Sequence, residues 1–235
     1  MKERGNILFL ILLAIILFVA LSYAVNSGMR GGGKTGSGEK AQAQVSSILN
    51  FLDLMSSTVM RMTVSGGIKP DTISFSYNYK QQDGTVTVGG FANPNCLTNE
   101  CGIFKTGGGG VSSQTFETYG HPDPTGITGT STMPGYYQFL LMQFPYAGTA
   151  LNDIVMRIVY LNTAVCDEIA ARLSLPTDTS ITGTYTSASN PANWDNAGYT
   201  VSTAIEPYLG KNTWLTYHGS GSGRYCHVGR LLIAR

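Results

Sequence analysis

The chain has 235 residues, of which 12% are charged, and its formal net charge is +1 at neutral pH. This balance offers no electrostatic attraction for the phosphates of nucleic acid or for other acidic ligands. The 29 glycines and the many Ser, Thr, Asn and Tyr residues are typical of an exported β-rich domain and not of a cytosolic enzyme.

The first element in chain order is an apolar run that begins at Ile7, directly after the charged head at residues 1–5. It continues to Val25 without a charge, and Ser22 and Tyr23 are its only polar residues. A helix of roughly 19 residues spans about 28 Å, which is close to the hydrocarbon thickness of a bilayer. We therefore expect residues 6–26 to form a transmembrane helix.

This apolar run fits more than one kind of N-terminal segment. Ser22-Tyr23-Ala24 is a small-x-small cleavage site, so the run can be a signal peptide whose removal releases a secreted domain. An uncleaved run would be a simple membrane anchor. Basic residues occur on both sides of it, so lysine and arginine do not set its orientation.

A third interpretation comes from a family resemblance. The start of the chain, residues 2–6 (Lys-Glu-Arg-Gly-Asn) and the apolar helix after them, resembles that of a type IV pilin or pseudopilin. The resemblance implies that a membrane peptidase cuts after Gly5, on the cytoplasmic side, and leaves Asn6 as the new N-terminus. Two positions depart from the family: Leu10 stands where a glutamate usually pairs with a neighbouring subunit, and Asn6 replaces an aromatic residue or Met.

The resemblance also implies a function, partners and a location. It implies a structural subunit of an extracellular filament or secretion pseudopilus, a homo-oligomer assembled through its N-terminal helix. The implied partners are the membrane and a prepilin-peptidase-like protease. The anchor would lie in the inner membrane, and the globular domain in the periplasm or outside the cell. The alternative is a single-span or secreted binding module that holds glycan or protein through loops with Trp194, Trp214 or Tyr217.

Residues 27–38 follow the apolar run and are rich in glycine. Because each glycine costs a helix about 1 kcal/mol, we predict a flexible hinge here. Within it, Gly28 to Thr35 match the phosphate-binding pattern G-x-x-x-x-G-K-[ST]. That loop requires a strand before it and a helix directly after it, so we do not predict a nucleotide site.

Residues 39–64 are predicted to form an amphipathic helix that Ser37 caps. Apolar side chains recur at helical spacing from Ala41 to Met62, and polar ones, including Gln44, occupy the other face. The apolar stripe favours packing on a sheet of the same chain. Packing between subunits is a compatible alternative.

Beyond the helix the pattern alternates as in β-strands. The alternation predicts strands at 72–79 and 85–88, and further strands are expected at 111–119, 136–144 and 225–233. Residues 153–160 are apolar and fit either a strand or a helix, of which we favour the strand. Asp83-Gly84 predicts a hairpin turn, and Asn162 is expected to cap a helix at 163–173. Residues 65–235 are therefore predicted to be a disulfide-stapled β-rich globular domain. The fold class is α+β: a hydrophobic helix, a hinge, and an amphipathic helix on an antiparallel sheet with glycine-rich loops.

The four cysteines are Cys96, Cys101, Cys166 and Cys226. An even number in an exported chain predicts two disulfides, and three pairings are possible. A short loop between Cys96 and Cys101 closes easily, which would leave Cys166 with Cys226; the connectivity stays open. A metal site that includes His227 is the rival, but neither pair has the two-residue spacing of a zinc knuckle.

No residue pattern indicates catalysis, a cofactor or a metal ion. His121, His218 and His227 have no carboxylate at ligand spacing and no clear acid–base partner. Residues 219–223 (Gly-Ser-Gly-Ser-Gly) lack the strand-to-helix context of a nucleophile turn and predict a flexible loop. Asp195 is the only carboxylate in its loop, so calcium is not expected. We expect a protein that is not an enzyme.

Overall fold

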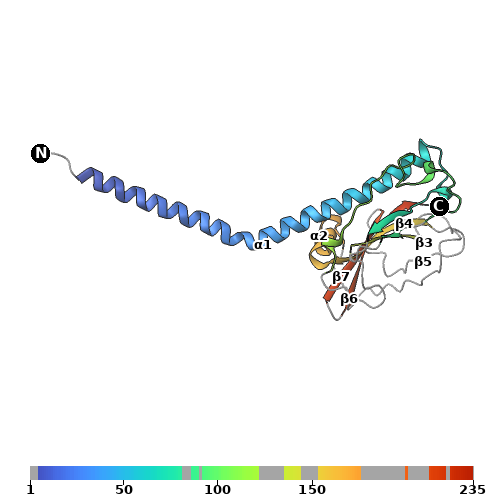
Figure 1. Cartoon of the computed structure of the whole chain (residues 1–235). Coiled ribbons are helices and arrows are strands. Elements are labelled where there is room, and N and C mark those ends of the chain that lie inside the picture. The colour runs from blue at the N-terminus through green and yellow to red at the C-terminus, as the bar shows by residue number, and fades with distance from the viewer. Residues whose placement is uncertain are drawn as a thin grey trace. The chain divides into compact units, whose positions relative to one another are not determined.

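The computed structural model divides the chain into two units, residues 1–43 and 44–235, and each is described by itself. Helix α1 (Gly5–Val64) contributes residues to both units (Figure 1). The structure describes residues 5–80, 86–89, 92–121, 135–143, 153–175, 199–200, 212–220 and 223–234.

The first unit is helical in all its described residues. Because residues 27–38 also lie within α1, the predicted hinge is not supported. Glycine lowers the stability of a helix without forbidding it, and helix propagates from both neighbouring segments once these have formed. Gly28 to Thr35 are helical too, so they do not form the loop that a phosphate site of this pattern requires.

The second unit is built around one large sheet. Among the described residues, five strands form it in the order β5-β3-β4-β7-β6. Neighbouring strands are antiparallel except β5, which runs parallel to β3. The α+β class is therefore confirmed, with one parallel pair that was not predicted. The strands are β3 (Tyr137–Gln143), β4 (Asp153–Asn162), β5 (Tyr199–Thr200), β6 (Thr213–Ser220) and β7 (Gly223–Ile233).

A second, smaller sheet pairs β1 (Tyr77–Lys80) with β2 (Val86–Gly89) in antiparallel orientation. This confirms the two predicted strands, but the first begins later than expected. The predicted turn at Asp83-Gly84 lies outside the described residues. Short 3-10 turns are formed by η1 (Pro70–Thr72), η2 (Asn99–Cys101) and η3 (Glu117–Tyr119).

The strand predicted at residues 111–119 is wrong. This segment has no strand assignment and ends in η3. Its buried side chains are Val111 and Phe116. They are five positions apart, so they cannot both lie on the same face of one regular strand.

Helix α2 (Thr163–Leu173) begins where it was predicted. The Asn162 side-chain oxygen accepts the backbone N–H of Val165 at 3.0 Å, which satisfies one free donor of the first turn. The predictions of β4 and of this helix are therefore confirmed. The helix ends at Leu173, and Ser174, its C-cap, has a left-handed backbone conformation (φ 53°).

The second half of α1, residues 44–64, and α2 cover the same face of the sheet (Figure 1). On β7, Cys226 and Arg230 point to one side because alternate residues share a face. Arg230 forms an ion pair with Asp53 of α1 at 2.7 Å, and Cys226 is bonded to Cys166 of α2. His227, one residue on from Cys226, faces the opposite side.

The core lies between these helices and the sheet. Phe51 packs its ring 5.4 Å from the rings of both Phe116 and Tyr137. Gln44, expected on the polar face, is buried, and its side-chain nitrogen lies 3.5 Å from the Thr118 carbonyl oxygen. The buried residues of α1 in this unit are Gln44, Val45, Ile48, Phe51, Leu52, Met55, Thr58, Val59 and Met62.

Strand β6 was not predicted. It pairs with β7 from Thr213 opposite Arg230 to Ser220 opposite Gly223. The flexible loop expected at 219–223 is therefore wrong for residues 219, 220 and 223, which belong to strands. The glycines and serines weakened the β-signal of this hairpin.

Candidate functional site

The first unit presents apolar side chains along its helix. Those of residues 11–19 are all exposed; Leu17 is 62% exposed and Phe18 is 72% exposed. An apolar helix surface of this extent is typical of a segment that lipid or other protein covers. Among the helices in the described part of the chain, none is at once long enough and apolar enough to cross a membrane.

The predicted processing site lies at the start of this helix. Gly5 is the first residue of α1, and Asn6 is the second. Cleavage between them stays a prediction, because nothing in the helix geometry tests it.

Both predicted disulfides are present. Cys96 is bonded to Cys101, and Cys166 to Cys226. The second bridge joins α2 to β7, and both of its cysteines are fully buried. Since Cys226 is bonded to sulfur, the rival metal site with His227 is not formed. The described residues contain no group of three His, Cys, Asp or Glu side chains that could hold a metal ion.

Residues 107–110 form a compact turn that we call the glycine knot. Its backbone N–H groups point inward: that of Gly109 donates to the Gly102 carbonyl at 3.0 Å, and that of Gly110 to the Lys105 carbonyl at 2.9 Å. A glycine-rich loop binds phosphate only when such N–H groups converge on an outside point. The glycine knot therefore has a packing role.

Close contacts with backbone atoms explain why position 108 of the glycine knot requires glycine. A Cβ on Gly108 would stand 2.7 Å from the carbonyl oxygens of Asn99 and Glu100. The Arg61 guanidinium of α1 donates to the Gly109 carbonyl at 2.8 Å. The knot thus connects the end of α1 to the loop that the Cys96–Cys101 disulfide closes.

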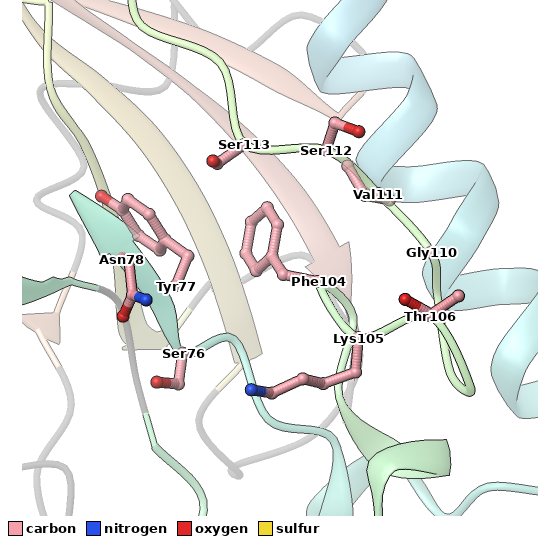
Figure 2. A pocket seen from close by; sticks show the side chains of 10 residues that line it. All are labelled: Ser76, Tyr77, Asn78, Phe104, Lys105, Thr106, Gly110, Val111, Ser112 and Ser113. Atoms are coloured by element: carbon pink, nitrogen blue, oxygen red, sulfur yellow. The ribbon is translucent and has the colours of Figure 1, made fainter. Parts of the chain in front are cut away.

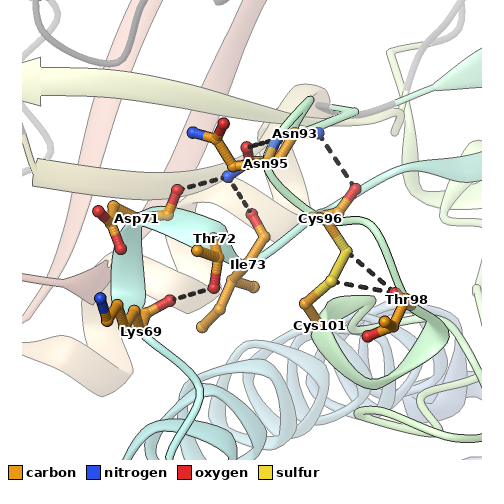
Figure 3. The surroundings of a disulfide bond; sticks show 10 residues. Lys69, Asp71, Thr72, Ile73, Asn93, Asn95, Cys96, Thr98 and Cys101 are labelled. Carbon is orange, nitrogen blue, oxygen red and sulfur yellow. Dashed lines mark hydrogen bonds between the residues drawn. A yellow bond between two sulfur atoms is a disulfide. The ribbon is translucent and has the colours of Figure 1, made fainter.

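Asn93 organises the other side of this disulfide (Figure 3). Its buried side-chain amide donates to the carbonyl oxygens of Asp71 at 2.7 Å and Ile73 at 3.1 Å. Its side-chain oxygen accepts the N–H of Asn95 at 2.9 Å. These bonds fix the approach to Cys96, while Leu97 within the disulfide loop is 89% exposed.

A groove of about 440 Å³ opens beside the glycine knot, and we call it the slot (Figure 2). Residues 76–78 form one wall, and residues 110–113 form the other. Phe104 lies between the walls, and the Lys105 and Thr106 side chains are at one end. The sequence did not predict the slot. Its only signal was the strand-like alternation on both walls, which does not reveal what lies between them.

Two histidines and two tyrosines gather near a bulge in β4. The Tyr160 ring lies 5.0 Å from the His227 ring and 5.5 Å from the Tyr225 ring, and Tyr225 lies 6.1 Å from His121. Tyr160 has a positive φ of 57°, which accompanies the shift of register between β4 and β7. Burial raises the pKa of Tyr225. This cluster has the geometry of packed aromatic rings.

Two of the three aromatic residues considered for ligand binding are buried. Trp214 is 2% exposed and Tyr217 is 1% exposed. The Tyr217 hydroxyl donates to the Asp167 carboxylate at 3.2 Å, and the Arg224 guanidinium lies 4.0 Å from the centre of the Tyr217 ring. These two residues therefore cannot stack on a ligand, while Trp194 and Asp195 lie outside the described residues.

Comparison of the chain with protein-family models, with curated proteins and with solved structures found no match. Among the described residues, the exposed apolar helix and the slot are two surfaces that are open to a partner.

Proposed function

We propose that the protein is a pilin-like structural subunit of an extracellular filament or secretion pseudopilus. Its N-terminal apolar helix would first hold the chain in the inner membrane and then pack against copies of itself at the centre of an assembly. A prepilin-peptidase-like protease would cut after Gly5, and Asn6 would become the mature N-terminus. The globular domain would lie in the periplasm or outside the cell.

The exposed apolar surface of residues 11–19 carries this proposal. A helix with apolar side chains on all sides is stable in lipid or among other apolar helices, and not as an isolated rod in water. The second half of the same helix, residues 44–64, is instead built into the domain core. Helix α1 would thus serve as a membrane anchor at its N-terminal end and as part of the domain core at its C-terminal end, as a pilin-like subunit requires.

The two disulfides support a location outside the cytoplasm. Disulfides form and persist in oxidising compartments such as the periplasm and the cell surface. The low charge and many neutral polar residues are consistent with that location.

N-terminal sequencing of the native protein tests the proposal, with two matched variants. Gly5→Leu is expected to block processing and leave Met1, while Ala24→Leu is expected to leave a start at Asn6 unchanged. A wild-type start at Val25, abolished by Ala24→Leu alone, would show a signal peptide and overturn the proposal. A wild-type start at Met1 would show a simple anchor.

Assembly needs a separate measurement. Sheared surface material from cells with the wild-type chain should contain fibres that antibodies to the domain label along their length. Cells with Gly5→Leu should lose them. A processed protein that never enters such fibres would contradict the structural-subunit role while leaving the membrane role intact.

The alternative binding module would require accessible aromatic side chains. Burial of Trp214 and Tyr217 removes two of the three aromatic residues on which it depended. We therefore do not prefer it.

A further inference from the structure

Three chain segments lie side by side at the base of the slot. The Ser74 N–H donates to the Cys101 carbonyl at 2.9 Å, and the Ile103 N–H donates to the Ser74 carbonyl at 2.9 Å. On the other side, the Val111 N–H donates to the Ile103 carbonyl at 3.1 Å. Residues 101–103 are therefore the middle segment of three.

The middle segment ends where the slot begins. After Ile103 the chain turns through Phe104 and Lys105 into the glycine knot, while the two outer segments continue as the walls of the slot (Figure 2). At the base of the slot one strand lies between the two walls. The walls are therefore two strand spacings apart, or about 10 Å. That width accommodates one further extended chain.

Backbone alternation directs peptide groups into this space. Both the N–H and the C=O of Ser74 point toward the middle segment, so those of Ser76, two residues on, point to the same side. On the opposite wall the Val111 N–H points toward the middle segment, so the N–H of Ser113, two residues on, points to the same side. Within the described part of the chain, neither Ser76 nor Ser113 makes a backbone hydrogen bond. Each wall thus offers a free peptide group at the height where the middle segment is missing.

The floor and the end of the slot define the side chains that would fit. The half-buried Phe104 ring lies 5.2 Å from the Tyr77 ring and provides an apolar floor. Lys105 is exposed at the end, and no carboxylate is among the described residues that line the slot. An occupant with one apolar side chain and a nearby carboxylate would match both.

We propose that the slot binds an extended segment of another protein, which adds the missing middle strand. Hydrogen bonds from the walls hold its backbone, Phe104 receives an apolar side chain, and Lys105 pairs with a carboxylate. This interaction is independent of the proposed filament, since no slot residue belongs to α1.

A labelled peptide of sequence acetyl-Thr-Val-Thr-Val-Asp-amide is the probe, and fluorescence anisotropy with the full-length chain in detergent is the measurement. Ser113→Pro removes an N–H that faces the slot, and Ser112→Pro removes one that faces away. We expect the first to weaken binding about tenfold and the second to leave it unchanged. Lys105→Gln should weaken binding about fivefold, while Lys69→Gln, outside the slot, should not.

Peptides with altered backbones test the wild-type protein without any risk to its folding. A version N-methylated at alternate amides is expected not to bind. Equal binding of this peptide, equal effects of the two proline variants, or no binding of the unmodified peptide would each overturn the proposal. Concentration-dependent self-association that the peptide reverses would show that the occupant is a second copy of this chain, and would overturn the commitment to another protein.

Discussion

The indole ring of Trp214 on β6 occupies the space above Gly229 on β7 that a side chain would otherwise fill. The two residues are directly opposite each other in the antiparallel pair. Because Gly229 has no side chain, the large Trp214 ring fits there and is only 2% exposed.

Replacement of this glycine should destabilise the fold. In Gly229→Ala the new methyl group overlaps the Trp214 ring, which must move or distort β7. We expect a loss of about 2 kcal/mol in the free energy of unfolding, as for other overpacked cores. Urea unfolding followed by Trp fluorescence measures it. Unchanged stability with unchanged fluorescence would show that the ring does not lie over Gly229.

The glycine knot offers a matched pair of substitutions. Gly108→Ala brings a methyl group against backbone carbonyl oxygens that cannot move aside, so we expect a loss of about 2 kcal/mol. Gly107→Ala meets its nearest neighbour, Asn99 Cβ, at 3.6 Å, an ordinary contact. It should be tolerated. Thermal unfolding of both variants makes the comparison, and equal effects would contradict the packing of the knot.

The two disulfides should differ in their effect on stability. The Cys166–Cys226 bridge closes 60 residues and is fully buried, whereas Cys96–Cys101 closes five. By loop entropy, the paired Ala replacement should cost about 4 kcal/mol at the long bridge and about 2 kcal/mol at the short one. Urea unfolding of each double variant tests the order. A larger loss at the short bridge would contradict it.

Stability should fall in alkaline solution. Burial raises the pKa of both Tyr137 and Tyr217 above the usual value of about 10. The unfolded chain then releases these protons at a lower pH than the folded protein. The contribution of these two hydroxyl groups to the free energy of unfolding is therefore complete below about pH 10 and is lost as the pH rises further. Urea unfolding between about pH 8 and pH 11 measures the decline, which Tyr217→Phe should make shallower. A constant stability over that range would contradict it.

A substitution in the glycine-rich part of α1 tests whether it is helical. Gly38 is in α1, and nothing lies within 4 Å of the place where a Cβ would stand. Gly38→Ala should therefore increase helicity by circular dichroism and stabilise this helix by about 1 kcal/mol. If the segment is instead a flexible hinge, helicity will stay the same.

Local signals predicted several elements well. Helix α2 was predicted because Asn162 is a strong N-cap, whose side chain accepts a backbone N–H of the first turn. Strand β4 was predicted because its residues are apolar over the length of a strand. The even number of cysteines in an exported chain predicted two disulfides, and the short spacing made Cys96–Cys101 easy to close, but the connectivity stayed open. For α2 and β4 the deciding interactions lie within the element or within a few residues of it.

The remaining features depend on contacts between distant segments. Strand β6 was missed although Thr213, Trp214 and Tyr217 have high β-propensity. Its pairing with β7 along its whole length, which the local pattern does not reveal, determines the strand. The slot could not be predicted because it depends on where residues 101–103 stop relative to two other segments. Glycine propensity also favoured a break at 27–38, where the structure has helix.

The position of β7 has a consequence for biosynthesis. It lies inside the sheet, between β4 and β6, although it follows both of them along the chain. The ribosome must therefore deliver residues up to 233 before the two halves of the sheet can join, so the domain closes only after synthesis has passed its last strand. Until then the hydrogen-bonding edge of β4 is open. The Cys166–Cys226 disulfide, whose formation needs an external oxidant to accept two electrons, cannot form before β7 is in place.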